Sequence, residues 1–342
     1  HDDPYSPGGR AGLRPNRAVI VYANLIRSVW KDAPVILGGM EASLRRLAHY
    51  DYWEDAIRRS ILLDSRADCL VYGNAENALA EIVQALRAGR PLAELACRGT
   101  VVVRPAMPDA PFLELPSFET VSRDPLAFAR MTRDALREIN APTPRILVQA
   151  HGNRFVWHMP PQPPLTEAQL DALYALPFTR REHPMYGKER VLALETVRHS
   201  IVTHRGCFGG CAFCALSYHQ GGVIQSRSIE SIAAEAERIC RDPSFRGTIT
   251  DVGGPSANMY GAFCGKNPGG RGCSRLSCLW PKICPHLHAG PEAILALWRR
   301  LRGVRGVRRI FVASGIRMDL ANRHPEYIRE LVQHHTGGHL KV

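Results

Sequence analysis

The sequence lacks two features that would place the protein in or beyond a membrane. No apolar run reaches the length of a bilayer span, and no basic stretch followed by an apolar one opens the chain. We therefore expect neither a membrane-spanning segment nor a secretion signal. The chain begins with His1 rather than Met, which we interpret as a processed, trimmed or partial chain. With 342 residues, it is long enough for two domains.

Lysine is also scarce. Lysines are 5 of the 44 basic residues, so the other 39 are arginine, and the net charge is +12. This bias is more typical of a coding preference than of a surface that binds phosphate. No basic block interleaved with aromatic residues occurs. The charge allows RNA or another nucleic acid as a partner without indicating one.

Cysteine, by contrast, is plentiful, with ten in the chain. Cys207, Cys211 and Cys214 follow one another at C-x3-C-x2-C spacing in a glycine-rich loop, directly after an expected strand at 200–204. Thiolates are the usual ligands of iron–sulfur clusters, and one short loop can direct three of them at the same cluster. Thiols that stay free for metal indicate a reducing compartment, so we expect a cytoplasmic protein.

A fourth cysteine at ferredoxin-like spacing is missing from this loop, and no proline follows Cys214. A cluster held by three ligands keeps one iron open, which suits substrate or cofactor binding better than electron transfer alone. Two alternatives remain open at this point. One is a zinc site completed by His204 or His219, and the other is a set of three unrelated buried thiols.

Residues 1–150 predict an α/β domain with a parallel sheet, because short apolar strands alternate with helices. The expected strands lie at 34–37, 69–72, 101–103 and 146–148, and the expected helices at 76–88 and 125–139. Ligands of such sheets bind at the carboxyl ends of strands, which here are 38–43 and 73–77. The glycines at these places could equally serve only to turn the chain. We expect 151–190, with its proline-rich connector, to link two domains.

Residues 191–342 predict a second alternation of strands and helices. The expected strands are 200–204, 248–252, 309–313 and one that starts at 339, and the expected helices begin at Ser228, Pro291 and Pro325. This is the pattern of four units of a β/α (TIM-type) barrel. Because a barrel must close to remove its edges, we expect the rest of the barrel to be missing from this chain. Chemistry in such barrels takes place on the loops that follow the strands.

The cysteine motif, with aromatic Phe213 just before its third cysteine, resembles that of radical S-adenosylmethionine (SAM) proteins. The resemblance implies that Cys207, Cys211 and Cys214 bind three irons of a [4Fe-4S] cluster and that SAM chelates the fourth. The reduced cluster would cleave SAM to methionine and a 5′-deoxyadenosyl radical. The electron would come from a donor such as flavodoxin or ferredoxin.

Two later segments resemble the cofactor-binding motifs of the same family. Asp251, Gly253 and Gly254 resemble the glycine motif beside the amino group of SAM, since glycines let a backbone approach a ligand closely. Ser314 and Arg317 stand where the family contacts the ribose or the carboxylate of SAM. The alternative is that the glycines only turn the chain and that Arg317 is a solvated charge.

The resemblance is closest to the YgiQ-type radical SAM proteins, whose substrate is not established. The segments that carry it are 38–46, 49–53, 205–211, 253–260 and 314–317. Gly222 departs from the pattern, because we expect arginine there. The N-terminal domain resembles the flavodoxin-like, cobalamin-domain-like module that precedes many radical SAM cores, with its first strand missing. The Asp-x-His-x-x-Gly signature is absent, so cobalamin binding is not supported.

A second set of cysteines consists of Cys264, Cys273, Cys278 and Cys284, in a polar loop rich in glycine, proline and basic residues. Four thiolates suffice for a [4Fe-4S] cluster or a zinc site. Their spacing matches no standard zinc finger, and the alternative is a structural set of reduced thiols. We therefore predict a radical SAM enzyme with an unknown substrate. The competing hypothesis is a non-enzymatic iron–sulfur or zinc protein that binds RNA or a protein partner.

Overall fold

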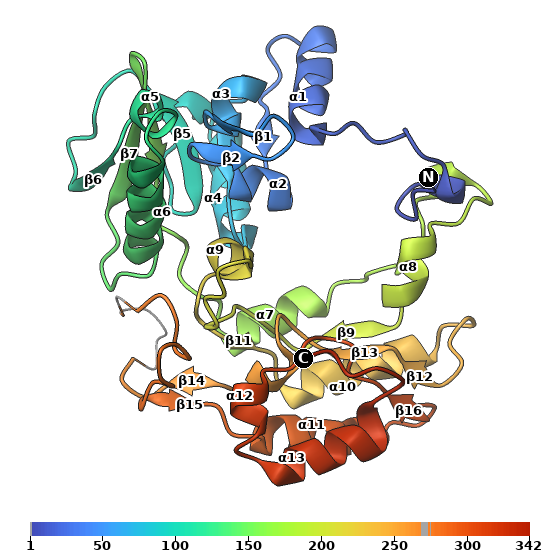
Figure 1. Cartoon of the computed structure of the whole chain (residues 1–342). Helices are drawn as coiled ribbons and strands as arrows, with labels where there is room; N and C mark the ends of the chain where they lie inside the picture. The colour runs from blue at the N-terminus through green and yellow to red at the C-terminus, as the bar shows by residue number, and fades with distance from the viewer. Residues whose placement is uncertain (1, 268–272, 274) are drawn as a thin grey trace.

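The computed structural model describes residues 2–267, 273 and 275–342, which form two parts joined near the middle of the chain (Figure 1). Within these residues, the N-terminal part has a six-stranded sheet in the order β1-β4-β5-β8-β7-β6. Its strands are β1 (Ile36–Leu37), β4 (Cys69–Val71), β5 (Thr100–Arg104), β6 (Phe112–Leu115), β7 (Ile146–His151) and β8 (Arg154–His158). A separate hairpin pairs β2 (His49–Asp51) with β3 (Ala56–Arg58).

The sheet is mixed, so the prediction of a parallel sheet was wrong. Pairs β1–β4 and β6–β7 are parallel, whereas β4–β5, β5–β8 and β7–β8 are antiparallel. The physical reason is clearest at β7 and β8, which are joined by two residues only, with Gly152 at φ +62°. A connection this short can join only antiparallel strands. Strand β8 lies in the stretch expected to be a linker, and it pairs inside the sheet.

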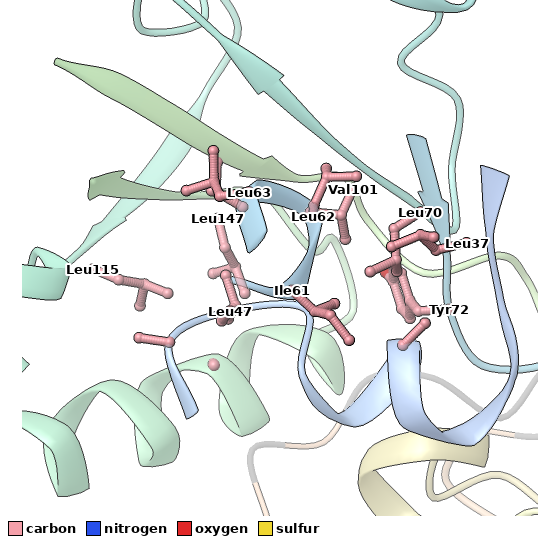
Figure 2. Packing of buried hydrophobic residues seen from close by; sticks show 14 of the residues in the cluster. Leu37, Leu47, Ile61, Leu62, Leu63, Leu70, Tyr72, Val101, Leu115 and Leu147 are labelled. Carbon is pink, nitrogen blue, oxygen red and sulfur yellow. The ribbon is translucent and has the colours of Figure 1, made fainter. Parts of the chain in front are cut away.

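Helices cover both faces of this sheet because successive strand residues point to opposite faces. Leu70 of β4 packs into a core with α3 and α6, whereas its neighbours Cys69 and Val71 pack with α4. Figure 2 shows the first of these cores, in which Leu70 and Val101 are fully buried. The helices of this part are η1 (Pro7–Gly9), α1 (Ala18–Val29), α2 (Gly39–Leu44), α3 (Ile61–Ser65), α4 (Glu76–Arg87), η2 (Leu92–Glu94), α5 (Phe118–Val121) and α6 (Pro125–Ile139).

The C-terminal part contains two parallel strand pairs. Strand β9 (Ser200–Val202) pairs with β13 (Asp251–Gly253), and β12 (Thr248–Ile249) pairs with β16 (Arg309–Ile310). Helices α10 (Ile229–Cys240), α11 (Glu292–Arg302) and α13 (Pro325–Glu330) pack around a core centred on Trp298. The strand expected from residue 339 is not formed. One backbone bond, from Ile316 N to Lys341 O at 3.0 Å, holds that segment, and a single bond makes no ladder.

Shorter elements complete this part. They are α7 (Glu167–Tyr174), η3 (Pro184–Tyr186), α8 (Leu192–Val197), β10 (His204–Arg205), α9 (Leu216–Gln220), β11 (Gln225–Ser226), η4 (Ala257–Met259), β14 (Phe263–Cys264), β15 (Leu287–His288), α12 (Met318–Ala321) and η5 (Leu331–His335). The side chains of Thr166 and Ser228 cap α7 and α10. None of the helices in the described ranges combines the length and apolarity needed to cross a membrane.

The two parts meet where α9, just after the cysteine loop, packs against α2 (Figure 1). Fully buried Arg46 lies between the rings of Tyr72 and Tyr218, 4.7 and 3.6 Å from their centroids. Its guanidinium donates to Nε2 of His158 at 2.8 Å and to the carbonyl oxygen of Tyr218 at 3.2 Å. These contacts fix the cysteine loop relative to the N-terminal sheet.

Candidate metal centre

The backbone of the cysteine loop, residues 206–215, is held tightly by two other segments. Gly206 has φ +87°, and a Cβ on it would lie 1.8 Å from the carbonyl oxygen of Val223. Gly210 has φ +61°, and its Cβ would lie 2.3 Å from the carbonyl oxygen of Leu276. Only glycine fits both the left-handed conformation and this close approach. The glycines of the motif therefore set the path of the loop that carries the cysteines.

The structure brings the three cysteines of the loop together. The Sγ atoms of Cys207 and Cys211 lie 3.4 and 3.6 Å from the position that a Cβ would take on Gly209. Burial raises the pKa of the Cys207 thiol, and the charges of Cys214 and Cys211 raise it further. Three thiols on one loop fit a cluster that supplies a separate iron to each of them.

The histidines considered as zinc ligands have other partners. The ring of His204 packs 2.5 Å from the Cβ position of Gly254, and its Nδ1 lies 2.8 Å from Thr203 Oγ1. Nδ1 of His219 lies 2.9 Å from Ser43 Oγ. Across the described ranges, no three His, Cys, Asp or Glu side chains are arranged around a single metal ion. Thiolates on different irons of a cluster need not converge in that way.

Arg317 places a positive charge directly beside this loop. Its Nη1 donates to Cys211 Sγ at 3.1 Å, and its Nη2 donates to Asp319 at 2.5 Å. Asn258 fixes the backbone of Arg317 with two hydrogen bonds, of 2.9 and 3.0 Å. A guanidinium at this distance from a sulfur places a positive charge and hydrogen-bond donors where an anionic group can bind.

The other residues predicted to bind the cofactor lie together: Asp251 and Gly253 belong to β13, Gly254 follows it directly, and Ser314 follows β16. Asp251 accepts hydrogen bonds from the backbone N of Ala313 and from the backbone N and Oγ of Ser314, at 2.8, 3.1 and 2.5 Å. A Cβ on Gly253 would lie 2.4 Å from Ser314 Oγ. Ser314 packs against Gly253, and His204 packs against Gly254, so closely that only glycine fits at these two positions.

Phe213, the aromatic residue of the cysteine motif, is exposed to solvent. Its side chain is 93% exposed, although it directly precedes Cys214 in the loop. An aromatic ring in water at this place can contact a bound cofactor or partner without any rearrangement of the core.

The second cysteine set is also brought together, beside the first. The four sulfurs interact electrostatically, since the pKa of Cys278 is raised to about 11 by burial and then by Cys284, Cys273 and Cys264. A cavity of about 120 Å³ is lined by Cys264, Cys273 and Cys278 together with Cys207. The structure describes all ten cysteines, and each of them is free of a disulfide.

Several residues that support the site were not predicted from the sequence. Ser277 Oγ donates to the carbonyl oxygen of Gly209 at 2.6 Å, which links the two cysteine loops. Arg205 donates to Glu76 at 2.6 Å and so ties the strand before the loop to the N-terminal part. The partners of each pair are 68 and 129 residues apart in the chain. Local sequence pattern contains no signal for such pairs.

Comparison with known proteins finds relatives over the whole chain. Residues 1–200 match the family model described as radical SAM N-terminal. The UPF0313 protein of Geobacter sulfurreducens is 54% identical over 345 residues, which cover 100% of this chain and 57% of that protein. The UPF0313 protein YgiQ of Escherichia coli K12 is 42% identical over 401 residues, covering 100% of this chain and 54% of YgiQ. The chain thus spans about half the length of the curated relatives it matches.

One solved structure with a weaker likeness is the radical SAM methyltransferase TsrM from Kitasatospora setae, with tryptophan substrate and a SAM analogue bound. It is 16% identical, with a TM-score of 0.36 over 70% of this chain and 33% of TsrM.

Proposed function

Because the chain belongs to the UPF0313 family that includes YgiQ, we propose that it is a radical SAM enzyme that cleaves SAM reductively at a [4Fe-4S] cluster. The observation that carries the proposal is the meeting of Cys207, Cys211 and Arg317 around Gly209. Three thiolates and an adjacent guanidinium leave one position of a cluster open to an anionic ligand. A cubic cluster with three protein ligands has one iron free for such a ligand.

Each residue of the site has a defined task under this proposal. Cys207, Cys211 and Cys214 hold three irons. When bound and reduced, the cluster supplies the electron that divides SAM into methionine and a 5′-deoxyadenosyl radical. Arg317 uses three of its five N–H groups on Cys211 and Asp319, and the guanidinium can direct the others at the carboxylate of SAM. The exposed ring of Phe213 contacts the cofactor.

A group of hydrogen-bonded residues near β13 and β16 keeps the cofactor-binding loops in place. The hydrogen bonds of Asp251 tie the start of β13 to residues 313 and 314, and Asn258 ties η4 to Arg317. The two parallel strand pairs support a β/α barrel core as the scaffold for these loops. An external one-electron donor such as flavodoxin or ferredoxin, in the cytoplasm, supplies the electron.

The test is reductive SAM cleavage by the full-length protein. The protein is reconstituted anaerobically with iron and sulfide, reduced with dithionite and supplied with SAM, and 5′-deoxyadenosine is then quantified. We expect brown protein with iron and sulfide near cluster stoichiometry, and 5′-deoxyadenosine that depends on both SAM and reductant. Colourless protein that takes up zinc, and forms no 5′-deoxyadenosine after iron reconstitution, would overturn the proposal.

A further inference from the structure

We propose that Cys264, Cys273, Cys278 and Cys284 form a second metal centre, with four thiolate ligands, that is separate from the centre at Cys207, Cys211 and Cys214. The first argument is the way the chain closes on itself at this place. Strands β14 and β15 pair antiparallel, with Cys264 opposite Leu287. The backbone N of Cys284 donates to the carbonyl oxygen of Cys278 at 2.7 Å. The two ends of the segment therefore lie close together, and cysteines stand at or near both ends.

The cavity between the two loops supplies the space for a metal centre. Its volume is about 120 Å³, and three cysteines of the set, Cys264, Cys273 and Cys278, line it. The backbone N of Cys278 donates to the carbonyl oxygen of Phe208 at 3.0 Å, which anchors the second set beside the first loop. No three His, Cys, Asp or Glu side chains of the described ranges are arranged around one ion. A single ion would therefore require the thiols to move closer together, whereas the larger span of an iron–sulfur cluster suits thiols that are farther apart.

The charge of the segment fits an anionic centre. Residues 262–288 contain four basic side chains (Lys266, Arg271, Arg275 and Lys282) and no Asp or Glu. A zinc ion with four thiolates carries a net charge of about −2, since each ligand contributes one negative charge. Arg275 donates to the carbonyl oxygens of Ser277, Trp280 and Lys282 at 3.1, 3.1 and 2.8 Å. Its guanidinium is thereby fixed by backbone oxygens of the segment that carries Cys278.

Apolar burial orders one part of this segment only, where Leu279 lies in a small core against which Cys278, Ile283 and Leu287 pack. Phe263, Leu276 and Trp280 are 53%, 43% and 75% exposed, whereas Leu279 is buried. Apart from β14 and β15, the described residues between 263 and 288 form turns and bends without helices or strands. Small loop-rich units of this kind generally need metal or disulfides, and the cysteines here are free. Metal–thiolate bonds would supply the missing order, as they do where metal binding is coupled to folding.

The experiment removes the first set of cysteines and measures what metal remains. The full-length triple variant Cys207→Ala, Cys211→Ala, Cys214→Ala is incubated anaerobically either with iron and sulfide or with Zn²⁺ alone. It is then desalted and analysed for metal. We expect about one zinc or about four irons per chain in at least one arm. The arm that loads identifies the metal, because four thiolates accept either.

A further pair of substitutions locates the remaining metal. Adding Cys273→Ala and Cys278→Ala should lower the bound metal at least tenfold, whereas adding Cys69→Ala and Cys97→Ala instead should leave it unchanged. Circular dichroism checks that each variant is folded. A folded triple variant that is metal-free in both arms would overturn the proposal, as would metal that persists without Cys273 and Cys278.

Limited proteolysis of the wild-type protein provides the test if the triple variant fails to fold. A chelator of zinc and iron should expose residues 262–288 to cleavage, and added metal should protect them again. Cleavage in this segment that is the same with and without metal would refute the second centre. The inference does not depend on the proposed function: protein that binds metal at the second set but never forms 5′-deoxyadenosine would end the functional proposal alone.

Discussion

The two cysteine-bearing loops lie side by side but are held in place differently. The first, 206–215, is fixed by Gly206 against Val223, by Gly210 against Leu276 of the second loop, and by Arg317 at 3.1 Å from Cys211. The second, between β14 and β15, has exposed apolar side chains and an excess of basic charge. We therefore expect the first loop to be shaped before metal binds, and under our proposal the second gains order from metal.

The two loops also differ in the number of thiols that they carry. Three thiols and a guanidinium suit a centre that must accept an outside ligand, whereas four thiols can satisfy a closed centre by themselves. Ser277, whose Oγ donates to Gly209 O at 2.6 Å, joins the two loops. Under our two proposals a reactive centre and a structural one lie side by side, and variants of each cysteine set test them separately.

The largest expected effect is on SAM cleavage. Substituting any one of Cys207, Cys211 or Cys214 by alanine should reduce 5′-deoxyadenosine formation to background, because two thiolates cannot hold the site-differentiated cluster. Cys69→Ala and Cys97→Ala serve as controls and should retain cleavage, since both residues lie in the N-terminal part, near β4 and β5. Undiminished 5′-deoxyadenosine from Cys211→Ala would show that the first loop is not the reactive one.

The next effect tests whether the first loop is shaped by protein. Gly206→Ala should destabilise the fold by more than about 3 kcal/mol, because its Cβ would lie 1.8 Å from a backbone oxygen in addition to the left-handed strain. Gly89→Ala is the matched control, with φ +75° shortly after α4 and no atom within 4 Å of the added Cβ. It should cost about 1 kcal/mol. Urea unfolding followed by circular dichroism measures both, and equal losses would contradict a loop fixed by crowding.

Arg317→Ala should have a moderate effect that is confined to the first centre. Loss of a group beside a metal ligand typically weakens affinity or activity by about 10- to 100-fold. We expect the SAM concentration needed for half-maximal cleavage to rise by this factor while iron content stays unchanged. Arg317→Lys, which keeps the charge, should recover part of the loss. The exposed Arg323 supplies the control, and an Arg323→Ala variant with the same defect would remove the special role of Arg317.

Ser277→Ala should give the smallest effect and should reach both loops. The substitution removes the bond to Gly209 O and leaves the backbone N of Leu279 and Trp280 without their Oγ acceptor, at a cost of about 1–3 kcal/mol. Ser228→Ala, which removes the cap of α10, should cost about 1 kcal/mol without changing metal content. The metal content, which should change in Ser277→Ala but not in Ser228→Ala, distinguishes the two variants. Unchanged metal in Ser277→Ala would mean that the loops are independent.

Local features of the fold could be predicted well from the sequence. Helix α6 spans Pro125–Ile139 as expected, and the capping box of Thr166 and Gln169 is formed. Strand pairing was harder, because apolar pattern indicates a strand without giving its direction. The two-residue connection at Gly152 and Asn153 was the signal for an antiparallel hairpin, and it was missed.

The site shows the same limit of local pattern. The spacing of Cys207, Cys211 and Cys214 predicts that they share a loop, because the three residues are close in the chain. The contact of Arg317 with Cys211 spans 106 residues, and it forms only because β9, β13 and the chain after β16 lie together. Such contacts depend on which strands pair in the tertiary structure. A local sequence pattern does not contain that information.

The central claim is that the first loop alone holds a cluster with an iron open to SAM. The most direct measurement is the EPR spectrum of reduced, reconstituted full-length protein carrying Cys273→Ala and Cys278→Ala, recorded with and without SAM. A [4Fe-4S] signal that changes when SAM is added is the predicted result. A cluster signal that SAM leaves unchanged in this variant, or a SAM-dependent change in protein that lacks Cys207, Cys211 and Cys214, would contradict the account.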